Sequence, residues 1–345
     1  MFGITSPQPP TAPLASVSGR LVTVAEAAAA IRQGRVLWIG GDETLLRQLP
    51  TGHWIGGSIP YFVAQDGGET SRERVFCSEL PPSIATGIDI RFYDLDTISR
   101  IAVEAPENGF TILLIPATSE LHLSYAQNAP GYEEMFLKPI AGWVTGVHLD
   151  DLGRSHPVVY NGKTGEASRE RGMVMHVALR PEKIAQIGIV NTFRQGNGDT
   201  LVFNETGFTA NRCEVNGVER NFAEYVREQK IDQRLPLVAD YSGTMINVGL
   251  QRVDERGDEV SFYAPVFKGI RYRFAAPVEN YVEAFQSAIP KLEQPVVFSC
   301  NCVLNYLYSE LEGKHTAHMT GPMTFGEIAY QLLNQTMVYL TVEDA

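Results

Sequence analysis

The side chains best suited to chemistry gather near the C-terminus, where the apolar run 296–298 gives way to Ser299, Cys300, Asn301 and Cys302. A run of β-branched and aromatic residues predicts a strand, and ligands in open α/β sheets bind beyond the C-terminal ends of strands. Cys300 and Asn301 are therefore candidates for the floor of a small-molecule pocket. The alternative is that both cysteines are small buried hydrophobes. Asn301 favours the pocket, because an amide in an apolar strand needs a partner.

A helix and a glycine-rich turn are predicted to follow this strand. Apolar residues three and four positions apart predict the helix over 303–311, and Gly321 and Gly326 permit backbone conformations in the turn that other residues avoid. If the ligand is an amino acid, Glu327 would bind its ammonium group and glycine N–H groups would bind its carboxylate. The structural alternative places Glu327 at the start of a helix. The predicted ligand contacts are Cys300, Asn301, Gly321, Thr324, Gly326 and Glu327, together with Gly56, Gly57 and Ser58 from a distant segment that encloses the same cavity.

The segment 142–151 is a further candidate contact region. It combines Trp143 and His148 with the aspartate pair Asp150-Asp151, and such mixtures are typical of binding loops. His148 is the predicted ligand contact here. A packed tryptophan beside solvated aspartates is the structural alternative.

The same residues allow three other chemistries. Cys300 and Cys302 with His315 and His318 would complete a tetrahedral zinc site, although zinc-binding cysteines are usually separated by two to four residues. His318 alone could bind haem. A hydrolase would use Cys300 as nucleophile with His315 or His318 as base. The sequence predicts no cofactor, and zinc and haem remain the alternatives.

Three short motifs occur in order near the C-terminus: Phe298-Ser299-Cys300, then 324–328 (Thr-Phe-Gly-Glu-Ile), then Asn334-Gln335-Thr336. They resemble the C-terminal half of the FIST family, ligand-sensing domains of bacteria, archaea and eukaryotes. The chain departs from the family pattern after Cys300, where FIST members usually carry Gly-Arg. The resemblance implies a sensory protein that binds an amino acid or a similar metabolite, and some family members resemble haem-dependent nitric-oxide sensors.

Composition narrows the class of protein. The chain has 345 residues, 44% of them hydrophobic, and a net charge of -12, so it can bury large cores and repels nucleic acid and anionic membranes. No apolar run approaches the length that crosses a bilayer, and the N-terminus lacks a signal peptide pattern. Four scattered cysteines favour a reducing compartment. We therefore expect a cytoplasmic protein that binds neither nucleic acid nor membrane.

The order of predicted elements favours an α/β or mixed α+β fold of two mixed sheets with outer helices. We expect a flexible Pro/Ala-rich arm at 1–20, a FIST N-like half at 21–165 and a FIST C-like half at 166–345. Strand, helix and glycine-rich turn occur at 36–62 and again at 296–325, which suggests a pseudo-twofold duplication. Strands are predicted at 88–93, 111–116, 158–160, 173–179, 200–203, 235–238, 245–248 and 259–263, and helices at 24–32, 43–49, 98–104, 181–186, 222–228 and 278–288.

These observations favour a binding protein over an enzyme. The sequence has no nucleophile elbow, P-loop, zinc-protease motif or dinucleotide fingerprint, whereas a sensor needs only a pocket and a movable element. We expect a sensory or regulatory protein that binds a small molecule without turnover and passes the signal to a separate protein. A Cys-dependent hydrolase, a haem-dependent nitric-oxide sensor and a self-assembling structural protein are the alternatives, and homo-oligomerisation is left open.

Overall fold

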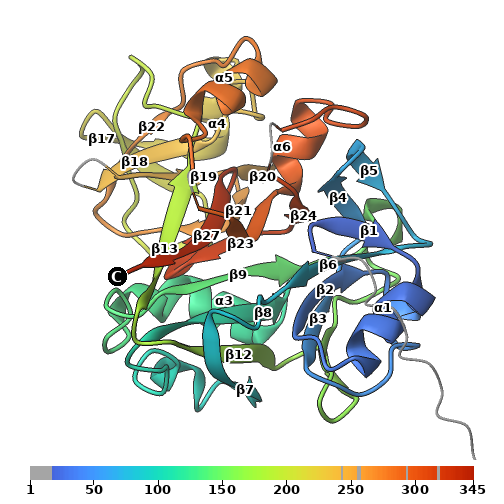
Figure 1. Cartoon of the computed structure of the whole chain (residues 1–345). Coiled ribbons are helices and arrows are strands. Elements are labelled where there is room, and N and C mark those ends of the chain that lie inside the picture. Colours follow the sequence, from blue (N-terminus) through green and yellow to red (C-terminus); the bar gives the residue numbers. More distant parts are fainter. Residues whose placement is uncertain (1–17, 242–243, 255–257, 293, 317–318) are drawn as a thin grey trace, which may run out of the picture.

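The computed structural model describes residues 18–241, 244–254, 258–292, 294–316 and 319–345. Within them, three stretches of the chain contain the same kinds of helix and strand in the same order. Each stretch, called a unit here, has an edge strand, two parallel strands joined across a helix, a hairpin and a returning strand. The three resulting sheets surround one core, and a separate lobe is inserted into the third unit (Figure 1).

The first unit starts with a well-capped helix. Thr23 and Glu26 form a reciprocal capping box that satisfies free N–H groups at the helix start, and the alanines that follow have high helix propensity. Gly34, at φ 78°, takes the left-handed conformation that ends the turn before the first buried strand. The elements are β1 (Arg20–Val22), α1 (Val24–Arg32), β2 (Leu37–Gly41), α2 (Glu43–Leu46), β3 (Trp54–Ser58), β4 (Tyr61–Ala64), β5 (Gly67–Thr70) and β6 (Val75–Glu79).

The second unit contains a fully buried pair of parallel strands. Its first parallel strand is buried at every position, as expected for a strand covered on both faces. The elements are β7 (Ala85–Tyr93), β8 (Gly109–Pro116), α3 (Glu120–Asn128), β9 (Ile140–Thr145), β10 (Val159–Asn161), β11 (Glu166–Ser168) and β12 (Gly172–Leu179), with short 3-10 turns at Ile98–Arg100, Ala129–Gly131 and Leu149–Asp151.

The third unit is interrupted by the lobe, which we call the insert (residues 191–295). The unit itself consists of β13 (Lys183–Val190), β23 (Val296–Cys302), α6 (Val303–Tyr308), β24 (Gly321–Thr324), β25 (Glu327–Ala329), β26 (Gln331–Leu333) and β27 (Met337–Asp344). The insert has its own two sheets and its own apolar core. Its elements are β14 (Leu201–Val202), β15 (Gly207–Ala210), β16 (Arg212–Val215), β17 (Val218–Asn221), α4 (Phe222–Glu228), β18 (Leu237–Tyr241), β19 (Thr244–Val248), β20 (Leu250–Val253), β21 (Val260–Val266), β22 (Arg271–Phe274) and α5 (Tyr281–Ala288).

The hairpins are exchanged between the sheets. The first unit's hairpin pairs with β24, the second unit's with β3, and the third unit's with β9. The three sheets consequently share one order, β1-β6-β2-β3-β10-β11, β7-β12-β8-β9-β25-β26 and β13-β27-β23-β24-β4-β5. Each sheet therefore contains strands from two units, and the exchange closes a ring.

A sequence repeat supports the equivalence of the first two units. Residues 69–74 read Glu-Thr-Ser-Arg-Glu-Arg and residues 166–171 read Glu-Ala-Ser-Arg-Glu-Arg. In both copies the serine Oγ accepts a hydrogen bond from the N–H three residues later, and the second arginine pairs with the first glutamate. The repeat thus builds the same connection from hairpin to returning strand twice.

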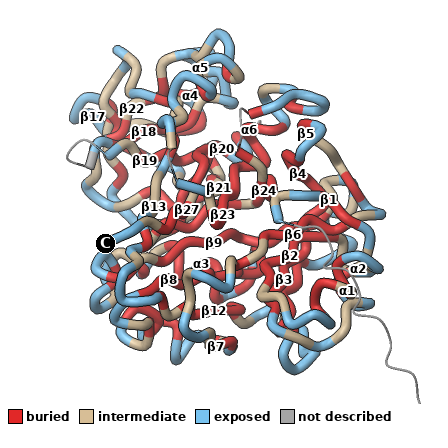
Figure 2. The backbone as a smooth tube through the Cα atoms, in the orientation of Figure 1, coloured by how far each residue is buried: buried red, intermediate tan, exposed pale blue. Residues whose placement is uncertain are grey.

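The inner faces of the three sheets meet in one core, and buried backbone follows their strands (Figure 2). Trp143 of the second sheet stacks on Phe298 of the third, with ring centroids 5.8 Å apart. Trp38 of the first sheet packs against Phe110 of the second at 6.1 Å. Large aromatic side chains therefore join all three sheets.

The structure confirms the mixed α+β, strand-rich composition and corrects several finer predictions. The described residues form five sheets rather than two, and among them the strand–helix–strand pattern occurs three times, because β8, α3 and β9 repeat it between the two predicted copies. The predicted helix at 181–186 is wrong, since β13 covers most of it. The predicted helix at 98–104 contains only a 3-10 turn. The boundary predicted at residue 165 falls inside the hairpin of β10 and β11.

Within the described residues, no helix is long and apolar enough to span a membrane.

Candidate functional site

The C-terminal ends of the three parallel strand pairs are alike. In each pair, the second strand ends in a buried hydroxyl residue: Ser58, Thr145 or Thr324. A cavity lies near the helix that follows the first strand of each pair. We call these cavities the first cleft, the second cleft and, for the third unit, the insert cleft.

The first cleft, of about 300 Å³, brings together two of the predicted contact residues. Ser58 lies at the end of β3 and His148 follows β9, and both line the cavity. The His148 ring stacks on Tyr61 at 5.5 Å, and its Nδ1 accepts a hydrogen bond from the Asp150 N–H at 3.2 Å. Ser58 Oγ accepts one from the Val158 N–H. Both His148 and Ser58 thus already accept a hydrogen bond from the backbone of the chain.

The second cleft is larger, about 720 Å³, and lies at the start of α3. Its cations are already paired: Arg169 binds both carboxylate oxygens of Glu43 at 2.9 and 3.0 Å, and Arg171 pairs with Glu166. Ser119 Oγ caps the helix by accepting from the His122 N–H. Both arginines of this cleft are therefore held by carboxylates of the chain itself.

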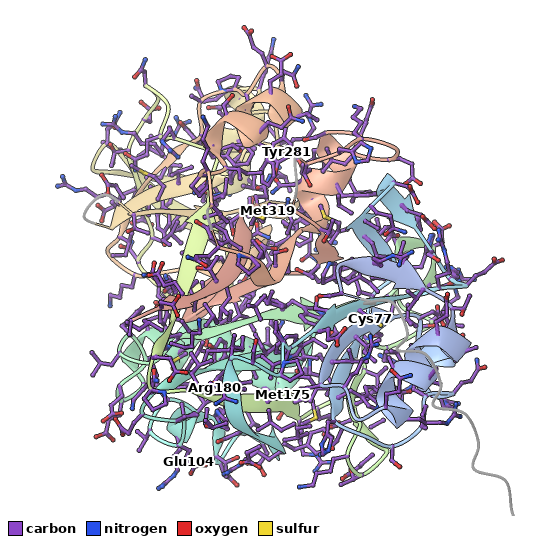
Figure 3. The ribbon with its side chains drawn as sticks, in the orientation of Figure 1. Cys77, Glu104, Met175, Arg180, Tyr281 and Met319 are labelled. Carbon is purple, nitrogen blue, oxygen red and sulfur yellow. The ribbon has the colours of Figure 1, made fainter. Side chains whose placement is uncertain are left out.

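The insert cleft, of about 430 Å³, lies where the insert meets α6. Tyr281, at the start of α5, lies on the cleft wall at this boundary (Figure 3). Arg234 is paired with Asp232 at 2.7 Å, whereas Lys314 Nζ contacts only Ser309 O, at 3.2 Å, among the described residues. The lining residues are Phe193, Asp232, Arg234, Leu235, 277–282, Asn305, Tyr308, Ser309, Glu310, Lys314 and Gln335. Both signs of charge and several aromatic rings therefore surround this cavity.

Gln335 lies between β26 and β27 of the third unit, in a segment that hydrogen-bonds to the insert, and we call Asn334-Gln335-Thr336 the junction. Gln335 Nε2 donates to Arg234 O at 3.0 Å, and Asn247 Nδ2 donates to Gln335 O at 3.2 Å. Gln335 adopts φ 51°, in the left-handed region that disfavours residues other than glycine. Its side chain is 2% exposed, and its Oε1 has no partner in the part of the chain that the structure describes. A buried acceptor without a partner is costly; this oxygen lies next to Gly249 of the insert, 3.0 Å from the position of a Cβ there.

Glu327 lies behind the junction and is fully buried. Its Oε2 accepts hydrogen bonds from Thr336 N at 3.1 Å and Thr336 Oγ1 at 2.9 Å, and the Cys302 thiol also bonds to the carboxyl group. Burial raises the pKa of Glu327 to about 8 against these hydrogen bonds, which lower it. The structural alternative of a helix start is wrong, because Glu327 begins strand β25.

Cys300, Asn301 and Cys302 are buried at the end of β23. Cys300 Sγ donates to Gly142 O at 3.2 Å. Asn301 Oδ1 accepts from Asn305 Nδ2 at 2.9 Å, and the Asn301 side chain also interacts with the Tyr281 hydroxyl, next to a void of about 10 Å³. That void holds at most one water molecule. Burial raises the pKa of Cys300 and Cys302 well above the ordinary thiol value, so both side chains are neutral thiols.

The predicted glycines are closely packed positions. A Cβ on Gly321 would lie 2.2 Å from Ser299 O, and one on Gly326 would lie 2.8 Å from Leu332 Cδ1. Gly56 lies against the Trp54 ring. Gly56 and Glu327 line none of the three clefts, so the structure does not show the predicted cavity shared by the two glycine-rich turns.

We expect Gly57→Ala to destabilise the protein by about 1 to 3 kcal/mol, the usual cost of overpacking a core. The added Cβ would lie 2.4 Å from Thr145 Cγ2 and 3.3 Å from Trp143 Nε1. Gly87→Ala is the matched control, because nothing lies within 4 Å of its Cβ position. Urea unfolding measures both variants, and equal midpoints would contradict a packing role for Gly57.

The structure also bears on the zinc and haem alternatives. Across the described ranges, no group of three or more His, Cys, Asp or Glu side chains lies where it could hold a metal ion. His315 is exposed, and His318 lies outside the described residues. The predicted shell of Cys300, Cys302, His315 and His318 therefore gains no support.

The Asn-Gln-Thr motif drew attention to the junction, but the sequence did not predict that these residues contact the insert and Glu327. Gln335, Lys314 and Tyr281 were missed as contacts, because they come from segments whose proximity depends on how the insert packs on α6. The φ of Gln335 and its unpartnered oxygen have no signal in the sequence.

Comparison with known proteins identifies a family but no activity. No curated protein and no solved structure matches the chain. A family model described as a family of unknown function (DUF6976) matches residues 22–343. This match spans all three units and the insert, and the chain therefore belongs to the DUF6976 family.

Proposed function

We propose that this protein is a sensory or regulatory protein of the FIST type, which holds an amino acid or a similar small zwitterion in the insert cleft without turnover. The observation that carries the proposal is Lys314, which lines the cleft and has no carboxylate partner among the described residues. A lysine ammonium group carries three hydrogen-bond donors, so a ligand with a carboxylate group would satisfy it.

The charges around the cleft suit a zwitterion. Lys314 has no carboxylate partner among the described residues, so its ammonium group would bind the ligand carboxylate. Glu279 and Glu310 also line the cavity and favour the ligand ammonium group. Tyr281 and Tyr308 supply aromatic surface, and such a mixture of apolar walls and a few polar groups is typical of ligand sites.

The position of the motifs supports the resemblance to FIST proteins. Thr324 and Thr336 belong to the second and third motifs, and both contact the Glu327 carboxyl group. Cys300, of the first motif, lies on the adjacent strand and interacts electrostatically with Glu327. One residue from each of the three FIST-like motifs thus interacts with the buried carboxyl group of Glu327.

Binding is favoured over hydrolysis by the state of the thiols. A thiol nucleophile acts as a thiolate and needs an adjacent base. Cys300 is 1% exposed and donates its hydrogen to Gly142 O, and burial raises its pKa. We further propose that the protein acts in the cytoplasm and passes its signal to a separate partner protein.

A thermal-shift screen of the twenty standard L-amino acids tests the proposal. We expect at least one to raise the Tm saturably, because a ligand that binds only the folded state stabilises it. Lys314→Met should weaken that binding about tenfold or more, since a charge-assisted hydrogen bond contributes roughly 1.5 to 3 kcal/mol.

Lys163→Met is the matched control for Lys314→Met, because Lys163 is an exposed lysine outside the three clefts. It should leave the affinity unchanged. A screen without any saturable shift, or equal affinities for the Lys314 and Lys163 variants, would rule out the proposed site.

A further inference from the structure

The charges that line the insert cleft do not balance. Arg234 and Asp232 cancel, because they form an ion pair at 2.7 Å. The remaining charged residues of the lining are one lysine, Lys314, and two glutamates, Glu279 and Glu310, and neither glutamate forms an ion pair within the described chain. An amino acid with a neutral side chain has one carboxylate and one ammonium group. It would therefore leave one glutamate of the cleft without a partner.

Lys314 and Glu310 belong to the same wall of the cleft, the loop that follows α6. Lys314 Nζ donates to Ser309 O at 3.2 Å, and this carbonyl group is bonded to the backbone nitrogen of Glu310. The lysine ammonium group therefore lies beside the Glu310 backbone. Because the ammonium and carboxylate groups of an α-amino acid are attached to one carbon atom, two opposite charges on one wall suit this end of the ligand.

Glu279 belongs to the other wall, which the insert forms. It directly precedes Asn280, whose Oδ1 accepts a hydrogen bond from Glu283 N at 3.2 Å at the start of α5. Gln286 of the same helix donates to His315 O at 3.3 Å and so holds α5 beside the loop after α6 (Figure 1). The second glutamate is therefore available to the far end of a ligand that Lys314 and Glu310 hold.

Each wall also carries an aromatic side chain. Tyr308 of α6 is 37% exposed and lines the cleft together with Tyr281 of α5. The face of an aromatic ring attracts a cation. A positively charged ligand side chain would therefore find aromatic surface as well as a carboxylate in this cavity.

We propose that the insert cleft selects an amino acid with a positively charged side chain, such as arginine or lysine. The inference rests on the proposed function. Lys314 binds the ligand carboxylate and Glu310 its α-ammonium group. Glu279 binds the side-chain cation, so the ligand connects the insert to the third unit and neutralises the excess negative charge of the cleft.

Isothermal titration calorimetry of the full chain with two matched pairs of probes tests the proposal. L-Arginine is compared with L-citrulline, which has a similar shape but no side-chain charge, and L-lysine with L-norleucine, which lacks the side-chain ammonium group. We expect the charged member of each pair to bind about fivefold more tightly, because an exposed ion pair and a cation–π contact each contribute modestly. Equal affinities within both pairs would overturn the proposal.

Three variants assign the contacts. Glu279→Gln should abolish the preference for arginine over citrulline and leave the affinity for citrulline unchanged, because only the side-chain contact is lost. Glu310→Gln should weaken both ligands by a similar factor and so keep the preference. Glu133→Gln is the matched control, at an exposed residue outside the three clefts, and should change neither affinity.

The outcomes separate this inference from the proposed function. If Glu279 serves only the helix dipole at the start of α5, Glu279→Gln lowers the Tm of the unliganded protein and the preference for arginine survives, which contradicts the inference. If amino acids with neutral side chains bind most tightly, the cleft stands as an amino-acid site and its selectivity for cations fails. If no amino acid binds, both proposals fail.

Discussion

Glu327→Gln is expected to make the protein more stable at pH 9 by roughly 4 kcal/mol, while the two chains have similar stability near pH 4.5. The pKa of Glu327 is about 8 in the folded chain, against an ordinary value of 4.5. Above pH 4.5 the folded state therefore keeps a proton that the unfolded chain loses, and the stability of the natural protein falls as pH rises towards 8. Each pH unit of this difference corresponds to about 1.4 kcal/mol.

Urea unfolding from pH 5 to pH 9 measures this difference. Glutamine can still accept the two hydrogen bonds from Thr336 and has no charge to bury, so the variant should lose less stability than the natural chain as pH rises. Glu73→Gln is the control, because Glu73 is exposed and its removal should leave the pH profile unchanged. Parallel profiles for the natural chain and the Glu327 variant would contradict a protonated carboxyl group in the core.

A buried acid of this kind opposes folding at alkaline pH, and a glutamine would avoid that cost.

Local sequence patterns predicted many elements but not their arrangement. The helices at 24–32 and 222–228 were predicted to the residue, because alanine content and periodicity act within a few turns. The helix predicted at 181–186 failed because β13 pairs with β27 along its whole length, and tertiary pairing outweighs weak propensity. The threefold pattern was missed because exchanged hairpins place sequence neighbours in different sheets.

The candidate site shows the same limit. Asn301 was recognised as unusual, since an amide in an apolar strand needs a partner, and the structure shows that it is buried, as are Cys300 and Glu327. Their partners come from other segments: Gly142 of the second unit for Cys300, and Thr336 of the junction for Glu327. Whether such a group faces a ligand or the core depends on those partners, which no local pattern specifies.

Trp143→Ala should have the second large effect, a loss of about 3 to 5 kcal/mol in the free energy of unfolding. Trp143 belongs to β9 of the second sheet, stacks on Phe298 of the third sheet at 5.8 Å and lies against Gly57 of the first. It is 1% exposed. Its truncation would therefore leave a cavity where all three sheets meet. Urea unfolding gives the measurement.

Trp143→Phe separates packing from hydrogen bonding at this position. Trp143 Nε1 is buried without a partner among the described residues, and removal of an unsatisfied donor recovers part of the energy lost with the smaller ring. We therefore expect the Phe variant to lose less than half as much stability as the Ala variant. Phe136→Ala, at a side chain 56% exposed, should cost less than about 1 kcal/mol. If Trp143→Ala cost no more than Phe136→Ala, the three sheets would not depend on this aromatic contact, and the threefold ring would be held together by strand pairing alone.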